Sequence, residues 1–256
     1  MTPTVLPGLL VAPGDLPPCL LLPGDPGRAA AIADRLDGAT LVANNREFHS
    51  YRGAFRGVPM GVVSTGVGAP SAAIACEEAI RAGGRVLIRV GTAGSLQDSI
   101  QDGDLVVAQG AARCEGTTPR LMPVELPALA DPDVAAALHR AARGRGAAVH
   151  RGTVVTLDPF YRGVLDLGLD LFSRAGALCV EMECAAVFTV AGLRGVRAGA
   201  VLAIDGDARR AAGGDYRPHR EVVRQAVELE IELALAAAAE LAPRAAVADR
   251  PGPGDH

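Results

Sequence analysis

Short apolar runs alternate with helical stretches along most of this chain. Runs of strand character occupy 19–22, 40–43, 59–65, 86–90, 104–109, 152–157, 178–182 and 199–204. Helical stretches occupy 27–36, 70–82, 132–144, 163–175, 183–193 and 217–241. Such alternation is typical of a layered fold, because a helix that follows a strand covers one face of the sheet. The sequence therefore predicts a three-layer α/β/α architecture with a central mixed, mainly parallel sheet.

Length and composition favour one large domain. The chain has 256 residues, of which 49% are hydrophobic, and it can therefore bury a substantial core. We expect a Pro-rich entry segment over 1–17, a single catalytic domain over 18–242 and a disordered tail over 243–256.

Charge and aromatic content exclude several classes of protein. A net charge of −4 gives no electrostatic footprint for nucleic acid or a membrane surface, and with 3% aromatics and no Trp a base-stacking platform is absent. The five cysteines show no C-x-x-C spacing and are expected to be buried, reduced and not bound to zinc. Prolines interrupt the apolar N-terminal residues and no apolar run could span a bilayer, so we expect a cytoplasmic protein.

An arginine lies inside one of the most apolar runs. Arg89 is flanked by Ile88 and Val90, and the run ends in small residues that include Thr92. A buried guanidinium is costly unless an anion neutralises it. Arg89 is therefore interpreted either as an anion ligand, with Thr92 and backbone N–H groups completing the site, or as half of a structural ion pair with a carboxylate.

A second candidate anion site follows the first strand-like run. Gly24 allows close approach of the backbone, and Asp25-Pro26 fits the N-cap and first position of a helix. Arg28 then lies in the first helical turn, where a cation opposes the helix dipole unless an anion is bound. Two arginines at strand ends, each beside a turn of small residues, favour a phosphate-sized oxyanion.

Carboxylates end two further apolar runs. Glu183, close to Glu181, could accept hydrogen bonds from the vicinal hydroxyls of a sugar, or could serve as a partner of the helix dipole. Asp205 and Asp207 flank Gly206, where one of them could be a general acid with a pKa raised by burial, or both could belong to a simple turn. His49 and His219 remain candidate site residues, and no pair of histidines has metal-ligand spacing.

Taken together, these motifs resemble the nucleoside phosphorylase superfamily, which holds uridine phosphorylases and hexameric bacterial purine nucleoside phosphorylases. The matching blocks are PGDPGR at 23–28, NREF at 45–48, STGVGAPS at 64–71, IRVGTAG at 88–94, DPFY at 158–161 and VEME at 180–183. They occur in family order across roughly residues 18–240. The resemblance implies phosphorolysis of a nucleoside to free base and pentose 1-phosphate, with inorganic phosphate as co-substrate and no organic cofactor.

The resemblance also implies a role for individual residues. Gly24, Arg28, Arg89 and Thr92 match phosphate ligands, and Arg46 matches an arginine that reaches the phosphate of the adjacent subunit. Met182 and Glu183 match ribose-binding residues, and Phe160 matches the aromatic residue that stacks on the base. Glu47, Val67 and Ser71 match positions that hold a monovalent cation, such as K⁺, at a dimer interface. A homo-oligomer is therefore expected, with a dimer as the active unit and a hexamer as a trimer of dimers.

Two departures leave the base and the pentose open. Leu6 stands where the family usually carries a histidine for the ribose 5′-hydroxyl, and the residues after Tyr161 lack the Gln-x-Arg pattern that reads uracil. Either Asp205 or Asp207 could assist departure of the base. The rival functions are a nucleosidase of the same superfamily, which uses water, and a non-catalytic nucleoside-binding sensor.

Overall fold

The computed structural model describes residues 5–210 and 219–245. Its strands are β1 (Cys19–Pro23), β2 (Asp37–Asn45), β3 (Phe48–Phe55), β4 (Val58–Val63), β5 (Val86–Ser95), β6 (Leu105–Cys114), β7 (Ala128–Leu129), β8 (Val149–Leu157), β9 (Cys179–Glu181) and β10 (Arg197–Asp207). Its α-helices are α1 (Pro26–Ala33), α2 (Ala69–Arg81), α3 (Pro132–Gly144), α4 (Leu169–Arg174), α5 (Cys184–Leu193) and α6 (Glu221–Ala245).

The strands form one mixed sheet, as predicted, but parallel pairs do not dominate it, because five of its ten strand pairs are antiparallel. Its order is β10-β6-β8-β9-β5-β1-β4-β3-β2, with β7 paired to β6. The pairs β1–β4, β1–β5, β5–β10, β6–β8 and β8–β9 are parallel, and the other pairs are antiparallel. Because β10 also pairs with β5, the strands β5, β10, β6, β8 and β9 close into a ring, which we call the closed ring. The strands β1 to β4 extend from it as an open sheet.

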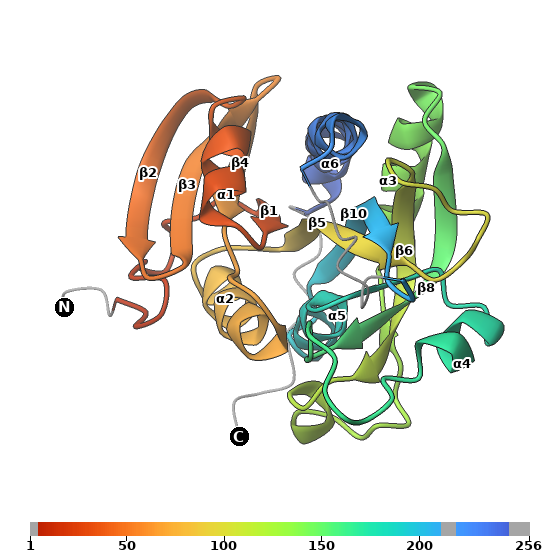
Figure 1. Ribbon diagram of the computed structural model, residues 1–256. Helices are drawn as coiled ribbons and strands as arrows, with labels where there is room; N and C mark the ends of the chain where they lie inside the picture. Colours follow the sequence, from red (N-terminus) through yellow and green to blue (C-terminus); the bar gives the residue numbers. More distant parts are fainter. Residues whose placement is uncertain (1–4, 211–218, 246–256) are drawn as a thin grey trace.

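Helices cover both faces of the sheet (Figure 1). The long α6 lies on one face, with α1 and α3 on the same side, while α2 and α5 lie together on the other. The helix ends follow from the sequence. Asp25 is the N-cap of α1 and its carboxylate accepts hydrogen bonds from the N–H groups of Gly27 and Arg28, with Pro26 at the first helical position.

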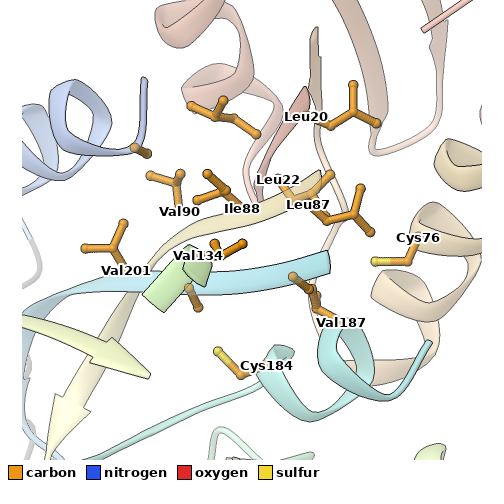
Figure 2. Packing of buried hydrophobic residues seen from close by; sticks show 14 of the residues in the cluster. Leu20, Leu22, Cys76, Leu87, Ile88, Val90, Val134, Cys184, Val187 and Val201 are labelled. Atoms are coloured by element: carbon orange, nitrogen blue, oxygen red, sulfur yellow. The ribbon is translucent and has the colours of Figure 1, made fainter. Parts of the chain in front are cut away.

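The largest core cluster lies between the sheet and the helices on its two faces. Leu87, Ile88 and Val90 of β5 are fully buried. Figure 2 shows that they pack among side chains from β1, α2, α5 and β10. Aliphatic and alanine side chains dominate this cluster, which explains how a chain with so few aromatics fills its interior.

The described part of the entry segment predicted over 1–17, residues 5–17, packs on the domain. Leu9, Val11 and Leu16 are buried, and the backbone N–H groups of Gly8 and Leu9 donate hydrogen bonds to the carboxylate of Glu78 in α2. At the other end of the chain, α6 continues to Ala245, and 246–256 lies outside the described residues.

Three expectations about local structure need correction. The helix predicted over 163–175 is limited to α4, because Gly168, with φ of +70°, precedes its first turn. The strand β3 was not predicted. It pairs antiparallel with β2, and the chain reverses between them in a tight turn at Arg46, whose φ is +55°. All five cysteines are free, but Cys114 is exposed and not buried. Among the described residues, no helix is both long enough and apolar enough to cross a membrane.

Candidate functional site

A cavity of about 1220 Å³ lies where β1, β5, β9 and β10 end. Ends of neighbouring parallel strands are where α/β folds place ligands. The candidate residues that line it are Gly24, Arg28, Glu47, Val67, Arg89, Thr92, Phe160, Met182, Glu183, Asp205 and Asp207. These eleven candidates are among the 27 residues that line the cavity, and they come from segments that are up to 183 residues apart.

Arg89 is 4% exposed and holds two buried carboxylates in the cavity wall. Its Nε donates to Glu181 Oε2 at 3.0 Å, and its Nη2 pairs with Glu183. Burial acts to lower the pKa of Arg89, but Glu183 and Glu181 hold that pKa above its usual value. The ion pair that the sequence left as an alternative is therefore present. The buried Nη1 has no hydrogen-bond partner among the described residues, so this guanidinium retains a donor.

Gly91 provides the space for that guanidinium. A Cβ atom at this position would lie 2.8 Å from Nη2 and 3.0 Å from Cζ of Arg89. The arginine side chain thus lies across the backbone of its own strand, two residues further on. A larger residue at position 91 would therefore collide with the Arg89 side chain, and the glycine within the Ile88–Gly94 block leaves room for it.

The two glutamates at the start of α5 have different tasks. Glu181 accepts hydrogen bonds from the N–H groups of Glu183 and Cys184 and from Thr156 Oγ1, so it is the carboxylate that serves the helix N-terminus. Glu183 accepts a hydrogen bond of 2.6 Å from the Gly68 N–H and lines the cavity. Burial raises the pKa of Glu183, and Arg89 opposes that shift.

Arg28 has a partner that sequence reasoning missed. Its Nη1 lies 3.2 Å from Oε1 of Glu230, a fully buried residue of α6. Because Asp25 already caps α1, the first-turn arginine does not need an anion to balance the helix dipole. Burial raises the pKa of Glu230 to about 8. An apolar helix stripe interrupted by one glutamate was the only trace of this contact in the sequence.

The two acids at the end of β10 occupy different surroundings. Asp205 is 4% exposed and lies at an irregularity in the register between β10 and β5, so the pair belongs to a bulged strand and not to a simple turn. Asp207 is bound by Arg209, whose Nε and Nη2 lie 3.1 Å and 2.9 Å from its two oxygens. Partial burial acts to raise the pKa of Asp207, but the hydrogen bonds from Arg209 hold it below its usual value.

The remaining candidates lie at the rim or away from the cavity. Arg46 is exposed in the β2–β3 turn and does not line this cavity. Ser71 Oγ donates to Glu47 Oε1 at 3.1 Å. Both side chains lie against Gly66, the residue before the exposed Val67, so the three cation-site candidates come from one small region. Phe160 is 57% exposed and contacts Tyr161 edge to face.

Three other residues singled out in the sequence, His49, His219 and Leu6, are not among the lining residues of the cavity. Leu6 packs against the core cluster. Within residues 5–210 and 219–245, no group of three or more His, Cys, Asp or Glu side chains is arranged to hold a metal ion.

Comparison with known proteins gives a consistent result. The family model described as the phosphorylase superfamily matches residues 18–240. A guanosine phosphorylase of Halorubrum lacusprofundi is 44% identical over 201 residues, covering 78% of this chain and 83% of that protein. A uridine phosphorylase of Thermococcus kodakarensis is 41% identical over 204 residues, covering 75% and 74%. The solved purine nucleoside phosphorylase of Toxoplasma gondii, in complex with immucillin-H, superimposes with a TM-score of 0.89 at 31% identity, covering 95% and 99%.

Proposed function

Because this chain belongs to the phosphorylase superfamily, we infer that it is a pentosyltransferase that cleaves a nucleoside with inorganic phosphate. The products are a free base and a pentose 1-phosphate, and the reaction needs no organic cofactor. The observation that carries this assignment is the pairing of Arg89 with Glu183 in the cavity wall. It provides a cation for phosphate directly beside a carboxylate for sugar hydroxyls.

Phosphate is proposed to bind between the ends of β1 and β5. Gly24 and Thr92 lie at these ends, and Arg28 and Arg89 bring two positive charges to the same cavity. Guanidinium groups suit this task because their planar donors match the oxygens of a phosphate. Nη1 of Arg89, which has no partner in the part of the chain that the structure describes, is a donor that a phosphate oxygen would satisfy.

The sugar is proposed to bind beside that phosphate. Glu183 would accept hydrogen bonds from the ribose hydroxyls, and Met182 would pack on the ring. Since Glu183 and Arg89 are in contact, the two ligands that they hold would be neighbours, with a phosphate oxygen facing C1′. The dianion would then stabilise the positive charge that develops on the sugar as the glycosidic bond breaks.

The leaving base needs a proton or a hydrogen bond, and Asp205 is the better candidate to supply it. Asp207 is held by Arg209 as an ionised pair, which makes it a poor acid near neutral pH. Asp205 is buried and lines the cavity. Phe160, which also lines the cavity, would stack on the base.

A homo-oligomer with shared sites is proposed as the active form. Arg46 is exposed and lies outside the wall of the cavity of its own chain, so it would reach phosphate only in a neighbouring subunit. A dimer would be the active unit and a hexamer a trimer of such dimers. Glu47, Val67 and Ser71 would hold a monovalent cation such as K⁺ near that interface, since Glu47 and Ser71 are already in contact.

One assay tests the function and its rivals. Base release is measured for uridine, thymidine, inosine, guanosine, adenosine and methylthioadenosine, each with and without phosphate. Phosphorolysis predicts release that depends on phosphate and forms pentose 1-phosphate, and the rates rank the bases. Release that persists without phosphate would establish a nucleosidase. Nucleoside binding without turnover of any substrate would establish a sensor.

A further inference from the structure

Glu230 is a buried acid behind the cavity. It belongs to α6, its side chain is fully buried, and it does not line the cavity. One oxygen, Oε1, contacts Arg28, while Oε2 has no hydrogen-bond partner among the described residues. A buried polar atom without a partner reduces stability, so its presence calls for a role other than stability.

The charges that act most strongly on Glu230 belong to residues that line the cavity. Arg28 from α1 and Arg89 from β5 attract its negative charge, and Asp205 from β10 repels it. Glu230 therefore lies close to cavity residues proposed to hold phosphate, Arg28 and Arg89, and to Asp205, which is proposed to assist the base. It is placed to influence ligands there without touching them.

The geometry of Arg28 shows how that influence would be exerted. Its side chain is 19% exposed and lines the cavity, yet only Nη1 has a hydrogen-bond partner among the described residues. A guanidinium is rigid and planar, so fixing one nitrogen from behind sets the direction of the others. Nε and Nη2 of Arg28 are then left for a ligand.

We propose that Glu230 is a positioning residue that holds Arg28 from behind, so that the remaining donors of Arg28 face an oxyanion in the cavity. The identity of that oxyanion as phosphate rests on the proposed function. Glu230 itself would not contact phosphate, nucleoside or the reacting atoms.

The charge state of Glu230 would be coupled to the oxyanion. Burial favours its neutral form, with a pKa of about 8, and a bound dianion would favour that form further. A dianion should therefore bind more tightly when Glu230 is protonated. The affinity contributed in this way is present below pH 8 and decreases as the pH rises through that value.

The test compares variants of two glutamates on one helix. Glu230→Met removes the acceptor and keeps the size, whereas Glu230→Gln keeps an acceptor oxygen for Arg28. Glu228→Met is the matched control, because Glu228 also joins α6 to the α1 region, through Arg35, but is half-exposed and does not line the cavity. The KM values for phosphate and for nucleoside are measured separately, after each variant is shown to be folded.

We expect Glu230→Met to raise the phosphate KM about tenfold or more, which corresponds to the loss of one charge-assisted contact, and to change the nucleoside KM by less than about twofold. Glu230→Gln below pH 7 and Glu228→Met should resemble the wild type. In an Arg28→Met background, Glu230→Met should add little further loss, because both changes disable the same donor.

Sulfate, which stays a dianion over the whole range, is the probe for pH. Its inhibition constant should rise between pH 7 and 9 in the wild type and less so in Glu230→Gln. An unchanged phosphate KM in Glu230→Met, or equal losses in both KM values, would overturn the positioning role. If Glu230→Met does not fold, the positioning role would be overturned in either of two cases. One is a sulfate inhibition constant that does not change with pH in the wild type, and the other is the same pH dependence in the wild type and in Glu230→Gln. A wild type without phosphate-dependent turnover would instead refute the proposed function, and this inference with it.

Discussion

Replacing Arg89 should destabilise the fold as well as stop turnover. The guanidinium is 4% exposed, and the side chains of its partners Glu181 and Glu183 are 0% and 7% exposed. Arg89→Met would leave two buried carboxylates facing each other without a cation. Breaking a buried ion pair in this way costs about 3–5 kcal/mol, which is a large part of the roughly 5–15 kcal/mol by which a domain is stable.

Urea unfolding measures this loss of unfolding free energy directly, and thermal unfolding measures it as a lower Tm. For a chain of this size, 3–5 kcal/mol corresponds to a decrease in Tm of about 6–20 °C. Arg140→Met is the matched control, because Arg140 forms an exposed pair with Glu240 and its loss should cost no more than about 1 kcal/mol. Arg89→Met combined with Glu183→Gln should recover part of the stability, since the double variant removes one uncompensated charge.

The effect of pH gives an independent check. Burial already raises the pKa of Glu183, and the removal of Arg89 would raise it further. A carboxyl group with a raised pKa in the folded state binds protons more tightly there than in the unfolded chain, so the free energy of unfolding falls as pH rises. The cost of Arg89→Met should therefore be smaller at pH 5 than at pH 8. Equal unfolding midpoints for Arg89→Met and Arg140→Met would refute this reasoning.

Three further predictions concern other parts of the site. Asp205→Asn should lower kcat on purine nucleosides about a hundredfold, whereas Asp207→Asn should change kcat little, as steady-state assays will show; equal small effects would exclude both acids. Mixing inactive Arg46→Ala and Asp205→Asn subunits should restore activity through mixed dimers, and no recovery after verified subunit exchange would exclude shared sites. The wild type should lose stability on the order of a few kcal/mol between pH 5 and 8 as Glu230 ionises, a slope that urea titrations should find reduced in Glu230→Gln.

Local patterns predicted the parts of the site that depend on a single segment. The apolar run around Arg89 indicated a buried strand, and Asp25-Pro26 indicated a helix start; both are confirmed. Local patterns failed where the apolar residues serve no buried face. The helix predicted over 163–175 would include Val164 and Leu165, but Val164 is fully exposed and Leu165 largely exposed, in a loop before α4.

Contacts between distant segments could not be predicted from the sequence. Glu181 lies 92 residues from Arg89, and Glu230 lies 202 residues from Arg28. No spacing rule joins such residues, because the order of the strands in the sheet decides which of them meet. For Arg89 the sequence predicted, as one of two alternatives, a carboxylate partner without identifying which residue provides it. The contact between Arg28 and Glu230 was not predicted.

The closed ring divides the site into a part that is hard to change and a part that is easy to change. One part of the site comes from neighbouring strands of the ring, whose backbones are hydrogen-bonded to one another. It holds Arg89, Thr156, Glu181 and Asp205. Phe160 instead comes from the exposed connection between β8 and α4, where Tyr161 is 84% exposed. If Phe160 stacks on the base as proposed, changes in this exposed connection can alter the choice of base at little cost to folding. We therefore expect this connection, more than the ring, to differ between this chain and its relatives named guanosine phosphorylase and uridine phosphorylase, which are 44% and 41% identical to it.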